Sequence, residues 1–234
     1  MSSDLEYPHL FAAAACLAGA SRDQREQNLL NLPLLILHGL DDPIVRYDEA
    51  TALNVMNLRN AGAPVTLATI PATGHGLSLT GVEDWLLRQQ RQPTPTRVIG
   101  RTRQTSPQPL RNHWVTLLAL IWPHEQAAVT ADAHDRQIRV TTANVDEAAL
   151  DLVDLRRAGL TIDAVEVDGQ TLAAPPADYA HLRRREHRWR IDGCDARPEF
   201  DRTRYEAGGL TTLYQRGSLL IVAQIGRASC RERV

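Results

Sequence analysis

The chain has no lysine, few cysteines and nearly balanced charge, and the last two features each exclude a class of protein. All 26 basic residues are arginine, and the 28 acidic residues leave a formal net charge of −2. A chain this close to neutrality has no general attraction for nucleic acid or for anionic lipid. The three cysteines, Cys16, Cys194 and Cys230, are too few and too scattered for a disulfide framework or a zinc site.

Long apolar runs and targeting signals are missing as well. No apolar stretch approaches the roughly 18 residues of a membrane-spanning helix, so we predict no membrane span. The opening residues, MSSDLEYPH, lack the basic and apolar regions of a signal peptide. The histidines show no ligand spacing, and we predict neither a metal site nor a cofactor. The compartment and the oligomeric state stay open.

Up to about residue 92, the sequence has the pattern of an α/β protein. Hydrophobic residues make up 43% of the chain, which is enough for a core, and its wealth of alanine, arginine and proline is typical of a GC-rich bacterial genome. Strand–helix–strand alternation implies right-handed crossovers and a parallel sheet. Strands are predicted over 10–18, 33–38 and 65–70, and helices over 48–61 and 81–91. The predicted buried face of the first helix is Ala52, Val55, Met56 and either Leu58 or Arg59, and Gly62 is predicted to cap its C-terminus. That of the second helix is Trp85, Leu86 and Leu87.

A proline-containing linker over 91–96 ends this pattern, and a period of two follows. We therefore predict a small antiparallel β-sandwich-like module over 97–195, with a hairpin turn at Asp168-Gly169. Its strands are predicted over 97–104, 113–122, 127–133, 136–142, 148–153, 162–167 and 170–173, with another at 188–191. Residues 196–224 then predict the start of a further, truncated element with a buried strand over 219–223.

Two side chains in the first region have the spacing of an acid–base pair. Asp42 follows the strand that ends at His38, and His75 follows the next strand, within Thr73-Gly74-His75-Gly76. Active sites of open α/β sheets form at the carboxyl ends of strands, where such a carboxylate can accept the Nδ1 proton of the histidine. The flanking glycines are expected to permit an unusual backbone path that lets the ring reach inward. Asp41 is the rival acid, but its register points it elsewhere.

A nucleophile for this pair is missing, because no G-x-S-x-G motif occurs in the 234 residues. Ser21 follows Gly19-Ala20 but lacks the second glycine, and we interpret it as a loop residue. Ser78 lies too close to His75 in the chain to face it, and is expected near a helix N-terminus. His38 is interpreted as a hydrogen-bonded scaffold histidine.

A run of arginines around Trp189 offers a second candidate function. The arginines are Arg183, Arg184, Arg185, Arg188 and Arg190. Such a patch can bind nucleic acid, but Glu186 interrupts it and the net charge is negative. We favour a solvated strand surface that discourages edge pairing, and predict no nucleic-acid partner.

The phrases YPHLF, LPLLILHGLDDPIV and TGHG resemble the C-terminal half of the prolyl-oligopeptidase-like α/β-hydrolase domain, over residues up to about 92. A weaker resemblance links 113–155 to the β-rich module that some bacterial members append. The family pattern H-G-x-x-D-x-x-V makes Asp42 the acid of a Ser-Asp-His catalytic triad and His75 its base. The fold class implied is α/β, the C-terminal half of a hydrolase sheet followed by a β-module.

This resemblance implies a serine hydrolase that cleaves peptide or ester bonds, represented here by a fragment without its nucleophile elbow. Met1 is then expected to be an internal methionine, and the fragment alone to be inactive. A carboxylesterase-type hydrolase, or a non-catalytic binding protein that uses the β-module, remain alternatives. The last ten residues, 225–234, resemble a translated sequencing adapter and are expected to be an artefactual tail.

Overall fold

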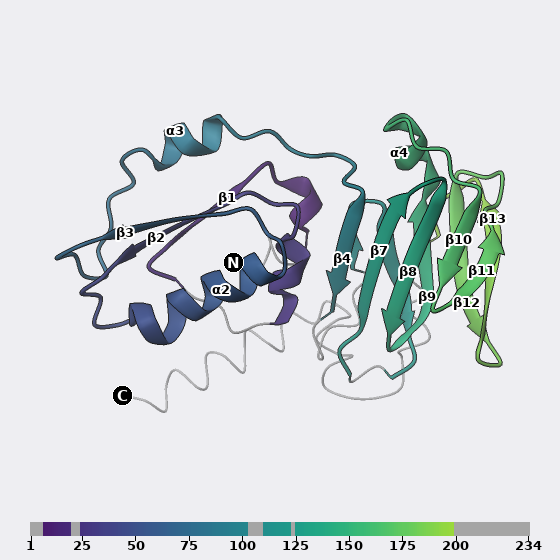
Figure 1. Ribbon diagram of the computed structural model, residues 1–234, viewed down its shortest axis with the longest axis horizontal. Coiled ribbons are helices and arrows are strands. Elements are labelled where there is room, and N and C mark those ends of the chain that lie inside the picture. The colour runs from purple at the N-terminus through teal and green to yellow at the C-terminus, as the bar shows by residue number, and fades with distance from the viewer. Residues whose placement is uncertain (1–6, 20–23, 103–109, 123–124, 199–234) are drawn as a thin grey trace, which may run out of the picture. The chain divides into compact units, whose positions relative to one another are not determined.

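The computed structural model describes residues 7–19, 24–102, 110–122 and 125–198, and in this part of the chain three sheets form (Figure 1). One is a three-stranded parallel sheet, and the other two have five strands each. The predicted element over 196–224 lies, from residue 199 on, outside the described residues, as does the tail over 225–234. The predicted division into domains stays a prediction.

The parallel sheet has the order β1-β2-β3 and consists of β1 (Ala14–Leu17), β2 (Leu34–Gly39) and β3 (Val65–Ile70). Every residue of β2 is buried, as expected of a central strand that is covered on both faces. The bounds of β3 match the prediction. β1 is shorter than the predicted strand over 10–18, because Pro8–Leu10 forms the 3-10 turn η1 instead. The first region is therefore a parallel α/β unit.

Helical segments flank these strands. They are the 3-10 helix η2 (Gln24–Leu29), the π-helical turn η3 (Tyr47–Thr51), and the α-helices α2 (Ala52–Asn60) and α3 (Val82–Leu87). In α2 the buried positions are Asn54, Val55 and Leu58, which lie on one helix face. The prediction for Met56 was wrong, since this side chain lies off that face and is half-exposed. The prediction that Leu87 is buried was also wrong, because α3 ends there and leaves the side chain in solvent.

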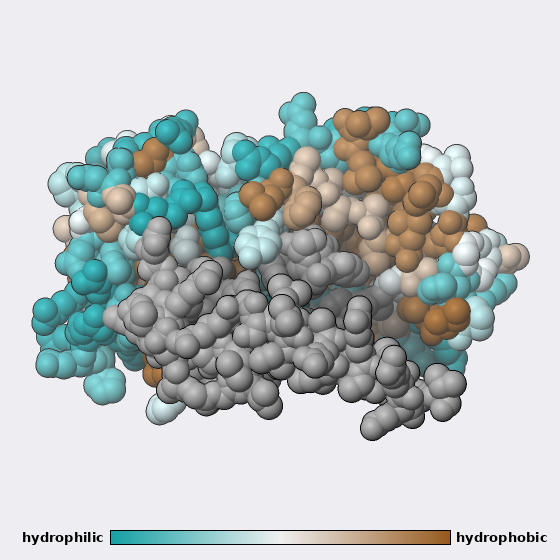
Figure 2. Space-filling view, turned by 180° about the vertical axis from the view of Figure 1, so that it is seen from behind, coloured by the Kyte–Doolittle hydropathy of each residue, from teal (hydrophilic) through white to brown (hydrophobic). Residues whose placement is uncertain are grey.

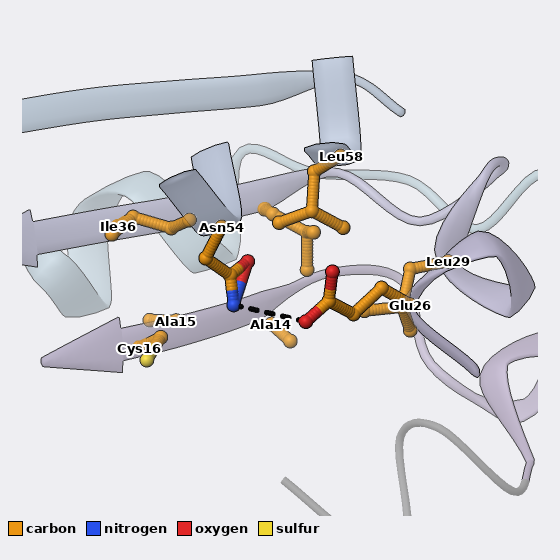
Figure 3. A pocket seen from close by; sticks show the side chains of 9 residues that line it. Ala14, Ala15, Cys16, Glu26, Leu29, Ile36, Asn54 and Leu58 are labelled. Carbon is orange, nitrogen blue, oxygen red and sulfur yellow. Dashed lines mark hydrogen bonds between the residues drawn. The ribbon is translucent and has the colours of Figure 1, made fainter. Parts of the chain in front are cut away.

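A small cavity of about 20 Å³ lies between α2, η2 and the sheet (Figure 3). Its lining is Ala14, Ala15, Cys16, Glu26, Leu29, Leu34, Ile36, Asn54 and Leu58. The amide of Asn54 points toward Glu26 and donates from Nδ2 to Oε1 across 3.2 Å. A space of this size holds about one water molecule and is too small for a substrate.

The remaining strands form two five-stranded sheets, with the orders β11-β10-β8-β7-β4 and β13-β12-β9-β6-β5. The first consists of β4 (Arg97–Arg101), β7 (Ala128–His134), β8 (Gln137–Ala143), β10 (Ala164–Val167) and β11 (Gln170–Ala173). The second consists of β5 (Arg111–Asn112), β6 (Val115–Leu120), β9 (Val145–Asp151), β12 (Tyr179–Arg185) and β13 (Arg188–Cys194). Side chains from both sheets join one hydrophobic cluster. The sandwich geometry itself stays a prediction.

Two features of this region bear on the predicted strand pairing. β8 and β10 pair in parallel, so the module is not fully antiparallel. Between them the chain enters the other sheet as β9 and returns through the unpredicted helix α4 (Leu152–Arg157), and such a crossover permits a parallel pairing. The predicted hairpin at Asp168-Gly169 is confirmed between β10 and β11, with φ of 48° and 82° at its two turn residues.

The predicted linker over 91–96 is held by hydrogen bonds. Nε1 of Trp114, a fully buried side chain, donates to the carbonyl of Pro95 across 2.7 Å. The side chain of Asn28 in η2 bonds both ways to the main chain of Arg101, with its Nδ2 donating to the carbonyl and its Oδ1 accepting from the amide. The first region and β4 are thus joined by directional contacts as well as by the chain.

Large apolar side chains are exposed mostly in the first region. Within the described residues they are Tyr7, Leu10, Phe11, Leu40, Ile44, Leu53, Met56, Leu79 and Leu87 there, against Ile121 and Trp122 in the β-region. Figure 2 shows apolar surface gathered mainly in the half that carries β1–β3. None of the helices that the structure describes is both long and apolar enough to cross a membrane.

Candidate active site

The candidate site lies where β2 and β3 end, at the carboxyl edge of the parallel sheet. The loop after β2 carries Asp42, and the loop after β3 carries His75. The two loops are tied together by their backbones, since the amide of Asp41 donates to the carbonyl of Thr73 across 3.1 Å. Neighbouring parallel strands end at the same edge, and this topology is what brings the two side chains together.

Asp42 is held by three hydrogen bonds. Its Oδ1 accepts from the amides of Ile44 at 2.8 Å and Val45 at 3.0 Å, and its Oδ2 lies 2.9 Å from Nδ1 of His75. The residue is only 4% exposed, and this burial raises its pKa. The hydrogen bonds from Val45, His75 and Ile44 outweigh burial and lower the pKa to about 2. Asp42 is therefore a carboxylate at neutral pH.

The tautomer of His75 follows from this contact. A carboxylate oxygen can only accept, so Nδ1 of His75 carries the hydrogen and donates it to Asp42. In a neutral ring, Nε2 is then left as the acceptor. No hydrogen bond to Nε2 occurs among the residues that the structure describes, and the side chain is 45% exposed. His75 can therefore accept a proton from a group that approaches Nε2.

Close approach of the two loops depends on Gly39. A Cβ built at this position would lie 2.2 Å from the carbonyl oxygen of Thr73 and 2.4 Å from that of Gly74. Both are backbone atoms, so a Cβ at this position could not be accommodated by the movement of a flexible side chain. Gly39 is thus the glycine that the site requires.

The expected role of the glycines beside His75 was wrong. Neither Gly74 nor Gly76 has a positive φ, and the left-handed residue of this loop is Ala72, with φ of 52°. A Cβ at Gly74 would meet only ordinary contacts at 3.9 Å, and one at Gly76 would meet nothing within 4 Å. The ring reaches inward through the hydrogen bond to Asp42.

Of the alternative residues, those that the structure describes have other contacts. Asp41 is exposed, and it contacts the loop of His75 through its backbone amide. Ser21 lies outside the described residues. The hydroxyl of Ser78 is engaged with Thr80, with its oxygen accepting from the Thr80 amide at 3.1 Å. His38 is fully buried and hydrogen-bonded.

A groove of about 450 Å³ adjoins Asp42. It is lined by Leu40, Asp41, Asp42, Pro43, Arg46, Tyr47 and Asp48. Its size is that of a small-molecule or peptide side-chain site, unlike the water-sized cavity under α2. No cluster of three or more histidine, cysteine, aspartate or glutamate side chains suited to a metal ion occurs in the described ranges.

A second carboxylate–imidazole pair, which sequence reasoning missed, lies in the β-region. Nε2 of His181 on β12 donates to Oε2 of Glu147 on β9 across 3.1 Å. Arg183 lies along the ring, with Nη2 3.1 Å from Nδ1 and Nε 3.4 Å from Nε2. Burial, and after it the charge of Arg183, lower the pKa of His181. Because its ring nitrogens are occupied and buried, this pair offers no free base.

The arginine run around Trp189 is largely engaged within the protein. Arg183 pairs with Asp192 at 3.4 Å, and Arg185 with Glu147 at 3.2 Å. Arg184 lies over the ring of Trp189, with 6.0 Å to its centroid. The absence of a nucleic-acid partner stays a prediction.

No protein-family model matches this chain, and no curated protein matches it either. Solved structures similar to it include SOBER1 from Arabidopsis thaliana, a thermostable esterase, and the esterase PE8. SOBER1 is 28% identical with a TM-score of 0.32, over 37% of this chain and 45% of that one. The thermostable esterase is 25% identical with a TM-score of 0.35, over 38% and 27%. PE8 is 18% identical with a TM-score of 0.27, over 32% and 36%.

The chain thus covers less than half the length of each of these three structures. Scores of this size do not define a family. The chemistry of the chain is therefore inferred from the geometry around Asp42 and His75.

Proposed function

We propose that Asp42 and His75 are the acid and the base of a serine-hydrolase site that cleaves ester or peptide bonds. The observation that carries this proposal is the 2.9 Å contact between Oδ2 of Asp42 and Nδ1 of His75, whose side chain is 45% exposed and whose Nε2 has no hydrogen bond among the described residues. A buried carboxylate that fixes a histidine tautomer is the arrangement that prepares an imidazole to take a proton from a hydroxyl.

The reaction proceeds in two halves. A serine hydroxyl gives its proton to Nε2 of His75 as its oxygen attacks the acyl carbon, and Asp42 stabilises the imidazolium. The imidazolium then protonates the leaving alcohol or amine, which leaves an acyl-serine. Water gives a proton to Nε2 and attacks the acyl group, and the proton returns to the serine oxygen as the acid departs.

The nucleophile in this proposal is a serine outside these 234 residues, since no G-x-S-x-G occurs within them. The phrases around Asp42 and His75 resemble prolyl-oligopeptidase-like enzymes, and this favours peptide bonds as the substrate. Ester cleavage uses the same atoms of His75, so a carboxylesterase-type activity is the neighbouring alternative.

The test is a polypeptide that joins this chain to an upstream segment with a G-x-S-x-G elbow, assayed on an activated ester and on peptides. His75→Ala and Asp42→Asn are each expected to lower kcat by roughly four orders of magnitude. Asp41→Asn is the matched control and is expected to change kcat little. If the His75→Ala protein hydrolyses substrate as fast as the parent, or if Asp41→Asn is the damaging change, the proposal is wrong.

The chain by itself supplies a second arm of the test. Because it has no elbow serine, it is expected to bind no serine-directed phosphonate probe covalently. Stoichiometric labelling, for instance at Ser21, would show that the nucleophile has been misplaced.

A further inference from the structure

His38 is a buried titratable side chain to which the proposed reaction gives no role. It is the penultimate residue of β2, and its side chain is 0% exposed. Nε2 lies 2.8 Å from the carbonyl oxygen of Val45, and Nδ1 lies 2.9 Å from Oγ1 of Thr51. One ring thus connects the end of the strand, the loop that carries Asp42, and the start of the helix that comes after it.

These two contacts fix the tautomer of His38. A carbonyl oxygen can only accept, so Nε2 carries the hydrogen and donates it to Val45. In a neutral ring Nδ1 is then an acceptor, and the hydroxyl of Thr51 donates its one hydrogen to it. The longer contact of Thr51 with the carbonyl of Gly19, at 3.3 Å, is secondary. The ring has a defined orientation because both of its nitrogens are bonded.

His38 is hydrogen-bonded to Val45, and Val45 is one of the residues hydrogen-bonded to Asp42. Val45 accepts from His38 through its carbonyl and donates through its amide to Oδ1 of Asp42 at 3.0 Å. With Oδ1 occupied by Val45 and Ile44, Oδ2 is the oxygen presented to His75. Nε2 of His38 is 3.8 Å from Oδ2, too far for a hydrogen bond. Its influence on Asp42 therefore passes through Val45.

We infer that His38 is a positioning residue for the acid–base pair, because it fixes Val45 so that Asp42 turns Oδ2 toward His75 as a carboxylate. Its catalytic meaning rests on the function proposed above. The geometric statement about Asp42 does not, and it can be tested on this chain without a substrate.

The test compares His38→Leu, which removes the donor, with His38→Gln, whose amide can still donate to Val45. The readouts are the pKa of Asp42 from carbon NMR of its carboxyl group, and the downfield proton signal of Nδ1 of His75. In the parent, the pKa of Asp42 is expected at about 2. In His38→Leu it is expected to rise toward 3.8, and the Nδ1 signal to broaden or vanish. His38→Gln is expected to keep both readouts close to those of the parent.

A role in packing alone predicts a different result. Both variants then lose stability while Asp42 titrates as in the parent, and this result overturns the inference. An equal rise of the pKa of Asp42 in His38→Leu and His38→Gln also overturns it, since the donor to Val45 would then not matter.

If His38→Leu does not fold, Thr51→Val loosens the same ring from its other side, with Thr51→Ser as the matched control. The pKa of Asp42 is expected to rise in Thr51→Val and to stay in Thr51→Ser. A folded Thr51→Val protein with an unchanged Asp42 titration overturns the inference. Loss of activity in Asp42→Asn tests the proposed function separately, so the two can fail independently.

Discussion

Two carboxylate–imidazole pairs in the described residues join groups that are distant in the sequence, and they differ in what surrounds the second ring nitrogen. In the first region, Asp42 bonds one nitrogen of His75, and the other, Nε2, has no hydrogen bond among the described residues on a side chain that is 45% exposed. In the β-region, Glu147 bonds His181 at a similar distance, but the guanidinium of Arg183 covers the ring. The pairs use the same chemical groups, yet only the first can exchange a proton with a visiting molecule.

The difference follows from where each pair sits in the fold. Asp42 and His75 lie on loops at a strand edge, where a side chain can face solvent on one side. Glu147 and His181 lie within paired strands, with Glu147 opposite Arg183 in the ladder between β9 and β12. Side chains on one face of a sheet lie close to one another, and here Arg183 contacts the ring nitrogen of His181 that Glu147 leaves free. Of these two contacts, only the one between Asp42 and His75 leaves a ring nitrogen without a hydrogen bond among the described residues.

Chemical modification should give the largest contrast between the pairs. Diethyl pyrocarbonate acylates neutral imidazole nitrogens that it can reach. We expect it to modify His75 to completion at pH 7 while His181 stays unmodified, because His181 is buried and bonded. Peptide mapping by mass spectrometry measures both. Comparable rates at the two residues would contradict the distinction.

The next largest effect is expected from Gly39→Ala, which should break the first pair and spare the second. The added Cβ overlaps two backbone carbonyl oxygens, so the loops must separate, at a cost of about 2–3 kcal/mol in the free energy of unfolding. The downfield signal of His75 Nδ1 should disappear, while that of His181 remains.

Gly76→Ala is the matched control for this change. It adds the same methyl group beside His75 with nothing within 4 Å, and its effect on stability should stay within about 1 kcal/mol. A larger loss in Gly76→Ala than in Gly39→Ala would mean that the packing of the loops has been misjudged. Urea denaturation of the two proteins decides the matter.

The glycines also show what could be predicted from the sequence. The contact between Asp42 and His75 could be predicted, because both residues follow strands whose apolar runs are evident in the sequence. The role of Gly39 could not be predicted, since the backbone atoms that a Cβ there would overlap belong to Thr73 and Gly74, in the loop after another strand. The prediction for Gly74 and Gly76 was wrong, because the presence of a glycine beside a functional residue does not show that the glycine has a positive φ.

In the β-region, too, some features could be predicted from the sequence and others could not. The hairpin at Asp168-Gly169 was predictable, because a two-residue turn with positive φ has a local signature. The helix α4 was missed although its signal is present, since the carboxylate of Asp151 caps the amide of Asp154. The bond between Glu147 and His181 had no such signal, because it depends on the register of two strands distant in sequence.

The next effect in size is expected from acid, which should act on the buried histidines before it acts on Asp42. Burial is the main cause that lowers the pKa of His181, and it lowers that of His9 to about 4. The unfolded chain takes up these protons first, so the stability that neutral histidines contribute is lost as pH falls below 6.5. For His9 alone this amounts to about 2 kcal/mol between pH 7 and pH 4.5.

The contribution of Asp42 to stability is also lost as pH falls, but in a lower pH range. Its folded pKa is depressed, so the stability it gives is lost only as pH falls through 3.8 toward 2. Urea denaturation between pH 7 and 4.5 should therefore show a decline that His9→Gln reduces and that Asp42→Asn leaves unchanged in slope. A slope that follows Asp42→Asn in this range would refute the assignment.

The smallest effect expected is that of Arg183→Gln, which asks whether Arg183 is what separates the two pairs. Arg183 is 41% exposed, so its loss should cost no more than about 1 kcal/mol in stability. Its charge is the second cause, after burial, that lowers the pKa of His181, and removing it should raise that pKa. Proton NMR of His181 measures the change. Arg184→Gln alters the next residue of β12, whose side chain lies on the opposite face over Trp189, and should leave the titration of His181 unmoved. An equal shift in both variants would mean that long-range charge, rather than the guanidinium on the ring, sets the state of His181.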